Sequence, residues 1–250
     1  MSSTQFTPSR EFELTILYDN MPKQPGFETA WGFACLIRGA EHAILFDTGG
    51  DGAVLLRNMQ RANVDPNEFD ILALSHQHWD HVGGLYHLLD ARQRHLALYV
   101  PASFSTHFKQ DVQRYDIELT NVCDPVRLAE GVMSTGDLSG AIREQALLLE
   151  TTRGVVIVTG CAHPGILKII ETVRDLLPQK HILLVLGGFH LMNDTETDIE
   201  RAVTRFRELG VEYVAPTHCS GEQTRAIFSH EYQAHFLAVG AGSVIRPNEL

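Results

Sequence analysis

The sequence places three imidazoles and one carboxylate within six residues, directly after a short apolar run. The run at residues 70–74 (DILAL) predicts a strand, and residues 76–81 (HQHWDH) follow it. Neutral imidazole and carboxylate are good ligands for Zn²⁺, and also for Fe and Mn. The alternative is a His-rich loop without metal, but unpaired polar groups in a buried loop would each cost on the order of a few kcal/mol. The chain is therefore constrained to a fold that brings further ligands to this strand end.

The spacing inside this segment suggests two metals. If the chain stays nearly extended after the strand, His76 and His78 point the same way, because side chains alternate with a period of two. Asp80 and His81 follow after the chain turns and can face a second metal. The pair Gly83-Gly84 allows a tight turn into a helix that begins at Leu85.

Length and composition predict one large domain over residues 1–250. Hydrophobic residues make up 44% of the chain and charged residues 20%, which excludes disorder, collagen and a coiled coil. We expect residues 1–10 to form a flexible tail. Residues 102–140 show no clean period and leave two alternatives open, a lid over a site and a loop-rich edge.

The predicted elements favour an α/β (more narrowly α+β) fold. In the first half, strands are expected at 12–18, 31–37, 43–46, 70–74 and 96–100, with short helices at 51–60 and 85–89. In the second half, we expect a hairpin of 144–150 with 155–159, helices at 166–177 and 195–209, and strands at 181–186, 211–215, 236–239 and 243–245. This order predicts a four-layer αββα sandwich, in which two mixed β-sheets pack together with helices outside.

The charge and the cysteine content restrict the partners. Lys and Arg total 20 against 31 Asp and Glu, so the net charge is 20 − 31 = −11. This balance argues against nucleic acid or an anionic membrane as the main partner. A small-molecule substrate is expected instead, and the oligomeric state is left open. No apolar run reaches the roughly 18 residues of a membrane span, and MSSTQFTPSR lacks the apolar core of a secretory signal. Four Cys form no disulfide framework, so a cytoplasmic setting is expected.

Three further His follow predicted strands. They are His163 in TGCAHPGI, His190 in GGFHL and His218 in PTHCSG. For any one of them, a hydrogen-bonded loop His is an equally good interpretation. For the set, convergence on one metal centre is the more economical explanation.

These motifs resemble the metallo-β-lactamase superfamily, whose HxHxDH signature is met by His76, His78, Asp80 and His81. Its Asp-Thr-Gly element is matched by residues 47–49. The phrases LFDTGG, LSHQHWDHVGGL, TGCAHPGI, GGFHL and PTHCSG resemble the subgroup of dihydropterin-methyl-ribofuranosyl-aminobenzene-phosphate synthase, an enzyme of methanopterin assembly. The resemblance covers about residues 12–245.

The resemblance implies two divalent metal ions, with Zn favoured and Mn or Fe as alternatives. One ion would be held by His76, His78 and His163, and the other by Asp80, His81 and His218. The superfamily usually carries a bridging Asp where this chain has Leu186-Gly187-Gly188. The nearest replacements are His190 and Asp194, of which we favour His190, as a ligand or a substrate contact.

Asp47 is expected to fix a ligand His through the other ring nitrogen of that His. The alternative is a turn-forming Asp. Cys161 and Cys219 could be soft ligands or redox-active, but small buried packing residues are favoured. Trp79 could wall a pocket or pack. Solvated surface charge is favoured over phosphate binding for Arg92, Arg94, Lys109 and Arg114.

The predicted activity is that of a metal-dependent hydrolase in which a metal-bound hydroxide attacks the substrate, with a phosphoester as the favoured substrate class. Asp80 would steer the hydroxide, and His190 would protonate the leaving group. One alternative is a transferase that joins a dihydropterin pyrophosphate to an aryl amine. Another is a non-catalytic metal-binding sensor. Redox chemistry is disfavoured, because His78 stands where the diiron relatives carry Glu.

Overall fold

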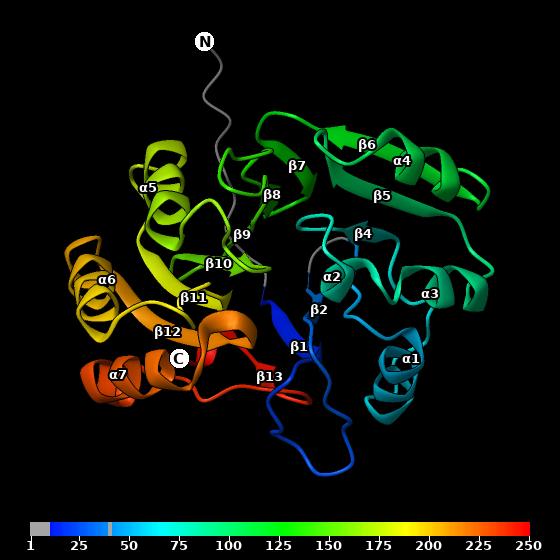
Figure 1. Ribbon diagram of the computed structural model, residues 1–250. Coiled ribbons are helices and arrows are strands. Elements are labelled where there is room, and N and C mark those ends of the chain that lie inside the picture. The colour runs from blue at the N-terminus through cyan, green and yellow to red at the C-terminus, as the bar shows by residue number, and fades with distance from the viewer. Residues whose placement is uncertain (1–10, 40–41) are drawn as a thin grey trace.

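Two mixed β-sheets lie face to face in this computed structural model, which describes residues 11–39 and 42–250 (Figure 1). The expected tail at 1–10 falls outside the described residues. The seven-stranded sheet has the order β13-β1-β2-β3-β4-β5-β6, and the six-stranded sheet has the order β12-β11-β10-β9-β8-β7. The strands of the first are β1 (Glu13–Tyr18), β2 (Ala34–Arg38), β3 (Ile44–Phe46), β4 (Ile71–Ala73), β5 (Leu96–Pro101), β6 (Ile117–Val122) and β13 (Val244–Ile245). The strands of the second are β7 (Val126–Ala129), β8 (Val132–Ser134), β9 (Leu147–Glu150), β10 (Val155–Thr159), β11 (Ile182–Gly188) and β12 (Val211–Thr217).

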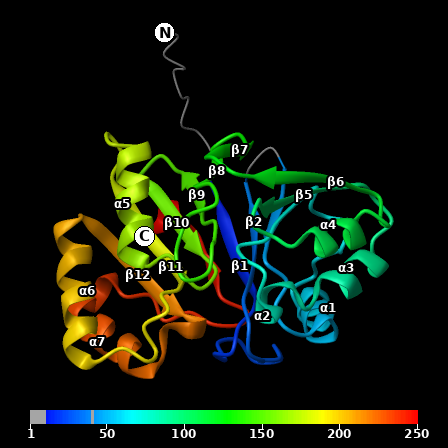
Figure 2. The ribbon, with the colours of Figure 1, turned by 45° about the horizontal axis from the view of Figure 1, so that its top comes forward.

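Helices cover the outer face of each sheet. One flank carries α1 (Gly52–Arg61), α2 (Trp79–Val82), α3 (Leu85–Ala91) and α4 (Thr106–Val112), and the other carries α5 (Ile166–Leu176), α6 (Glu196–Glu208) and α7 (Glu222–Tyr232). Three short 3₁₀ turns, η1 (His218–Ser220), η2 (Gln233–His235) and η3 (Pro247–Glu249), complete the described helices. Figure 2 shows α1, α3 and α4 on one side of the paired sheets and α5, α6 and α7 on the other. The predicted four-layer αββα sandwich is confirmed.

The core is divided into the three interfaces that four layers require. One cluster of buried apolar side chains fills the space between the two sheets, and one lies under the helices of each flank. β10, β11 and β12 run parallel and are almost wholly apolar, as expected of strands covered on both faces. No helix among the described residues combines the length and apolarity of a membrane span.

Several elements differ from the sequence-based expectation. Residues 102–140 contribute α4 and β6 to the first half of the sandwich and β7 and β8 to the second sheet. Residues 236–239 were wrongly expected to form a strand. After η2 the segment makes one isolated bridge, between Phe236 and Val214, because only the Leu237 N–H donates to the Val214 carbonyl, at 2.9 Å. α7 was not predicted, since its buried face consists of Thr224, Phe228 and Tyr232 alone.

Candidate metal centre

The predicted ligands gather at one edge of the sandwich, where four strands end. β10, β11 and β12 are parallel, so their carboxyl ends share this edge. They are followed there by His163, His190 and His218, while the HxHxDH segment arrives after β4 and continues into α2. The structure therefore brings together the side chains that the sequence had placed at separate strand ends.

A first group consists of His76, His78 and His163, whose ligand nitrogens lie within 4.8 Å of one another. Nδ1 of His78 is 3.2 Å from Nε2 of His163. Burial, reinforced by the neighbouring imidazoles, lowers the pKa of His76 far below its usual range and that of His163 to about 3. These rings are consequently neutral and offer lone pairs at neutral pH.

The orientation of His76 fits a cation. Ser75 Oγ donates to Asp47 Oδ2 at 2.7 Å, so it can accept from His76 Nδ1, which lies at 2.9 Å. The remaining nitrogen, Nε2, is buried and has no hydrogen-bond partner among the described residues. A buried lone pair aimed at two other imidazoles is costly by itself and is satisfied by a metal ion.

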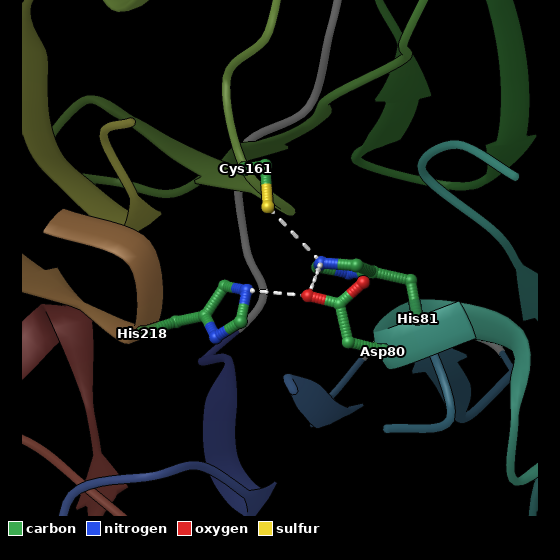
Figure 3. Close-up of side chains that lie close together, drawn as sticks. All are labelled: Asp80, His81, Cys161 and His218. Atoms are coloured by element: carbon green, nitrogen blue, oxygen red, sulfur yellow. Dashed lines mark hydrogen bonds and ion pairs between the residues drawn. The ribbon is translucent and has the colours of Figure 1, made fainter. Parts of the chain in front are cut away.

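A second group consists of Asp80, His81, Cys161 and His218, again with ligand atoms within 4.8 Å of one another. Figure 3 shows Asp80 and His81 pointing from α2 toward Cys161 and His218. His81 Nε2 lies 3.1 Å from Cys161 Sγ and 3.7 Å from Asp80 Oδ2, and His218 Nε2 lies 3.3 Å from the same carboxylate oxygen. All four residues are buried.

In each His of this group, the Nδ1 atom lies within hydrogen-bond distance of a side-chain oxygen. Asp47 Oδ2 lies 2.7 Å from His81 Nδ1, and Asn20 Oδ1 lies 3.0 Å from His218 Nδ1. Both Nδ1 atoms are thus the N–H donors, and the two Nε2 atoms face Asp80. Each Nε2 can face this carboxylate favourably only with a positive charge present, either a proton on the ring or a cation between the two atoms. The donor set therefore fits a divalent cation.

These contacts shift the pKa values of His81 and Asp80 in the second group. Burial opposes charge on His81, but the Asp47 carboxylate outweighs it and raises the pKa of His81 to about 9. For Asp80, burial is likewise outweighed by His218 and His81, which lower the pKa well below its usual range. Trp31 Nε1 also donates to Asp80 Oδ2 at 2.9 Å. Asp80 is therefore an oriented carboxylate.

Asp47 makes the contact that the sequence analysis expected, although the ligand role of His81 stays a prediction. Besides His81, it accepts the backbone N–H of Ser75 at Oδ1, at 2.7 Å. It is fully buried and has φ 61°, so it occupies a left-handed position at the end of β3.

Sequence reasoning missed Glu144, a fully buried carboxylate. Its Oε1 accepts the N–H groups of Cys161 and Ala162, and its Oε2 accepts that of His163, all at 2.9 Å. Burial raises its pKa. Nothing in the local pattern distinguishes this Glu from a residue at the start of a predicted strand. Asn20 was also missed, because its partner His218 is 198 positions away in the sequence.

A pocket of about 340 Å³ opens onto both groups. It is lined by Trp31, His78, Trp79, Asp80, Cys161, His163, His190, Met192, Asn193 and Cys219. Trp79, whose two interpretations the sequence left open, is 62% exposed and forms part of the wall. The four basic residues considered for phosphate binding are not among the lining residues.

His190 is exposed and lines this pocket with its ring centroid 4.2 Å from that of His163. Its ligand atom belongs to neither group above but lies within 4.8 Å of the thiols of Cys161 and Cys219. Contact with Cys219 raises the pKa of His190. Asp194, the other candidate for the missing bridge, is exposed and belongs to none of these groups.

Comparison with known proteins agrees with this geometry. The family model of the metallo-beta-lactamase superfamily matches residues 32–115. A 7,8-dihydropterin-6-methyl-4-(beta-D-ribofuranosyl)-aminobenzene-5'-phosphate synthase from Methanocaldococcus jannaschii is 25% identical, with the alignment covering 83% of this chain and 85% of the synthase.

Two crystal structures share the fold. That of Tm1679, a metal-dependent hydrolase of the β-lactamase superfamily, has a TM-score of 0.80 and 27% identity and covers 94% of this chain and 98% of its own. That of the metallo-beta-lactamase fold protein YhfI from Bacillus subtilis has a TM-score of 0.71 and 16% identity, covering 94% and 99%. With the HxHxDH segment at the strand end and the αββα sandwich around it, these similarities show the metallo-β-lactamase fold, together with a match to the superfamily's model over residues 32–115.

Proposed function

We propose that this protein is a metal-dependent hydrolase that acts on a small phosphoester, with two divalent cations, Zn²⁺ in the first instance, held beside the pocket. The observation that carries the proposal is the pair of ligand groups, assembled from the ends of β4, β10 and β12 and open to one cavity of about 340 Å³. The 27% identity to a protein described as a metal-dependent hydrolase supports the reaction class.

Six side chains are proposed as ligands. His76, His78 and His163 would hold one ion, and Asp80, His81 and His218 would hold the other. Cations in such a site supply activation of water and neutralisation of the negative charge that develops on the substrate.

The chain itself would supply orientation and proton transfer. Asp80, fixed by Trp31, presents a carboxylate at the pocket surface and can accept a hydrogen bond from the attacking water. His190 lines the same pocket and has a raised pKa, so it can hold a proton and donate it to the leaving oxygen. His190 is thus proposed as a proton donor, with His163 as its nearest ring neighbour.

One observation favours a second function. The 25% identity to the synthase from Methanocaldococcus jannaschii extends over most of both chains. In a transferase of that kind, the same site would assist departure of pyrophosphate from a dihydropterin while an aryl amine attacks.

The two functions are separated by one set of assays on the metal-loaded protein. Chromogenic phosphodiesters, phosphomonoesters and lactones are offered with Zn²⁺ or Mn²⁺, and a dihydropterin pyrophosphate is offered with and without an aryl amine. Turnover of a phosphoester supports the hydrolase. Pyrophosphate release that requires the amine supports the transferase, and a fully loaded protein without turnover on any substrate supports a sensor.

A further inference from the structure

The second ligand group contains a side chain that the six proposed ligands do not include. Cys161 comes from the loop after β10 and is 3% exposed. Its Sγ lies 3.1 Å from Nε2 of His81. A cysteine that only packs would face carbon atoms, whereas this sulfur faces a nitrogen in the same group as Asp80 and His218.

The four donor atoms lie close enough together to surround one ion: two of the three separations below fall in the range of tetrahedral coordination, and the one from His81 to Cys161 is slightly shorter. Ligand bonds of about 2.0–2.3 Å place neighbouring donors of a tetrahedral site roughly 3.3–3.8 Å apart. The measured separations are 3.1 Å from His81 to Cys161, 3.7 Å from His81 to Asp80 and 3.3 Å from His218 to Asp80. A second observation points the same way: Nε2 of His218 is buried and makes no hydrogen bond among the described residues.

The loop that carries Cys161 is built to serve both groups. Glu144 accepts the N–H of Cys161 at one carboxylate oxygen and that of His163 at the other. One buried carboxylate thereby fixes two side chains, two residues apart, of which His163 faces the first group and Cys161 the second.

At the end of β11, Gly188 lies against the two buried cysteines, Cys161 and Cys219. A Cβ atom added at Gly188 would lie 2.6 Å from Cys219 Sγ and 3.0 Å from the Cα of Cys161. A side chain therefore cannot project from Gly188 toward the centre, and no carboxylate is available from this position. The thiol that lies within the second ligand group is that of Cys161.

We propose that the Cys161 thiolate is the fourth protein ligand of the ion held by Asp80, His81 and His218. The inference rests on the metal centre of the proposed function. It makes the two sites unequal: the second has four protein ligands and is closed, whereas the three-His site has three and keeps a position open toward the pocket.

The test uses the full-length protein loaded with Co²⁺, read by absorption, together with metal stoichiometry. A thiolate ligand gives a near-ultraviolet sulfur-to-cobalt charge-transfer band. We expect the wild type to bind two ions and show the band. Cys161→Ser is expected to lose the band and to bind the second ion at least tenfold more weakly. The matched control is Cys219→Ser, which removes the other buried thiol at the pocket and is expected to keep the band.

The outcomes are distinct. A band that survives in Cys161→Ser, or that disappears only in Cys219→Ser, overturns the assignment of Cys161 while leaving the metal centre intact. A wild type that binds no ion overturns the proposed function together with it. Sulfur scattering at the zinc edge in the Zn²⁺-loaded wild type needs no variant, so absence of a sulfur neighbour there overturns the assignment even if Cys161→Ser fails to fold.

Discussion

Glu144 Oε2 accepts the backbone N–H of His163 at 2.9 Å, and so a fully buried carboxylate positions a candidate metal ligand without touching its ring. The other oxygen of Glu144 holds the two preceding N–H groups of the same loop. Ala162 lies between the two candidate ligands at φ 67°, a left-handed conformation that the three hydrogen bonds help to stabilise.

Replacing Glu144 by Ala should therefore damage both stability and metal binding. Each buried N–H left without an acceptor costs about 1–3 kcal/mol. We expect the free energy of unfolding in urea to fall by at least about 3 kcal/mol and metal affinity to fall roughly 10–100-fold. The matched control is Glu118→Gln, because Glu118 is an exposed residue of β6 away from the site. Unchanged affinity in folded Glu144→Ala protein would show that the loop holds its shape without this carboxylate.

The histidines could be predicted from the sequence because they follow strands that can be recognised from their own apolar residues. The two-sheet architecture was predictable for the same reason. Glu144 and Asn20 could not be predicted, because their importance depends on partners 19 and 198 residues away. The strand β6 within residues 102–140 was not predicted because its apolar face is short. Ile117 and Leu119 lie on one face, Asn121 interrupts that face, and Val122, the one buried side chain, lies on the other.

Asp47→Asn is expected to weaken the second site selectively. Asp47 accepts from Ser75 N–H and from its hydroxyl, and it also holds Nδ1 of His81. An Asn amide has only one acceptor oxygen, so its NH₂ group must face either Ser75 or His81. We expect roughly 10–100-fold weaker binding of one of two ions, measured by competition with a chromogenic chelator. Equal weakening of both ions, or of neither, would contradict this role.

His78→Ala should abolish turnover while leaving the fold intact, because His78 is half-buried and contacts the pocket with no described role in the core. The variant is expected to bind one ion fewer and to show the wild-type circular dichroism spectrum. His107→Ala is the matched control, since that side chain is 86% exposed on α4. Near-wild-type turnover in His78→Ala protein of verified metal content would rule out the proposed mechanism.

Removing the metal should lower the melting temperature. A ligand that binds only the folded state at a hundred times its Kd stabilises it by about 2.7 kcal/mol. For a chain of this length that corresponds to roughly 5–10 °C per ion. Differential scanning calorimetry with chelator, followed by addition of Zn²⁺, measures the effect. Identical melting curves under the two conditions would mean that neither ligand group binds Zn²⁺ appreciably.

Asp19 should make the metal-free protein less stable as the pH rises toward neutrality. The side chain is fully buried, and burial raises its pKa to about 6 from 3.8, although it accepts hydrogen bonds from Thr217 Oγ1 at 2.6 Å and from the Met21 N–H at 2.7 Å. Because the folded-state pKa lies above the unfolded value, the stabilising contribution is complete below pH 3.8 and is lost as the pH rises through 6. The loss amounts to roughly 3 kcal/mol.

Asp19→Asn has no such titration, so we expect its stability relative to wild type to increase by about that amount between about pH 4 and 7. Urea unfolding of both chelated proteins across this range measures the difference. A difference that stays constant with pH would show that Asp19 is ionised in the folded state at its ordinary pKa.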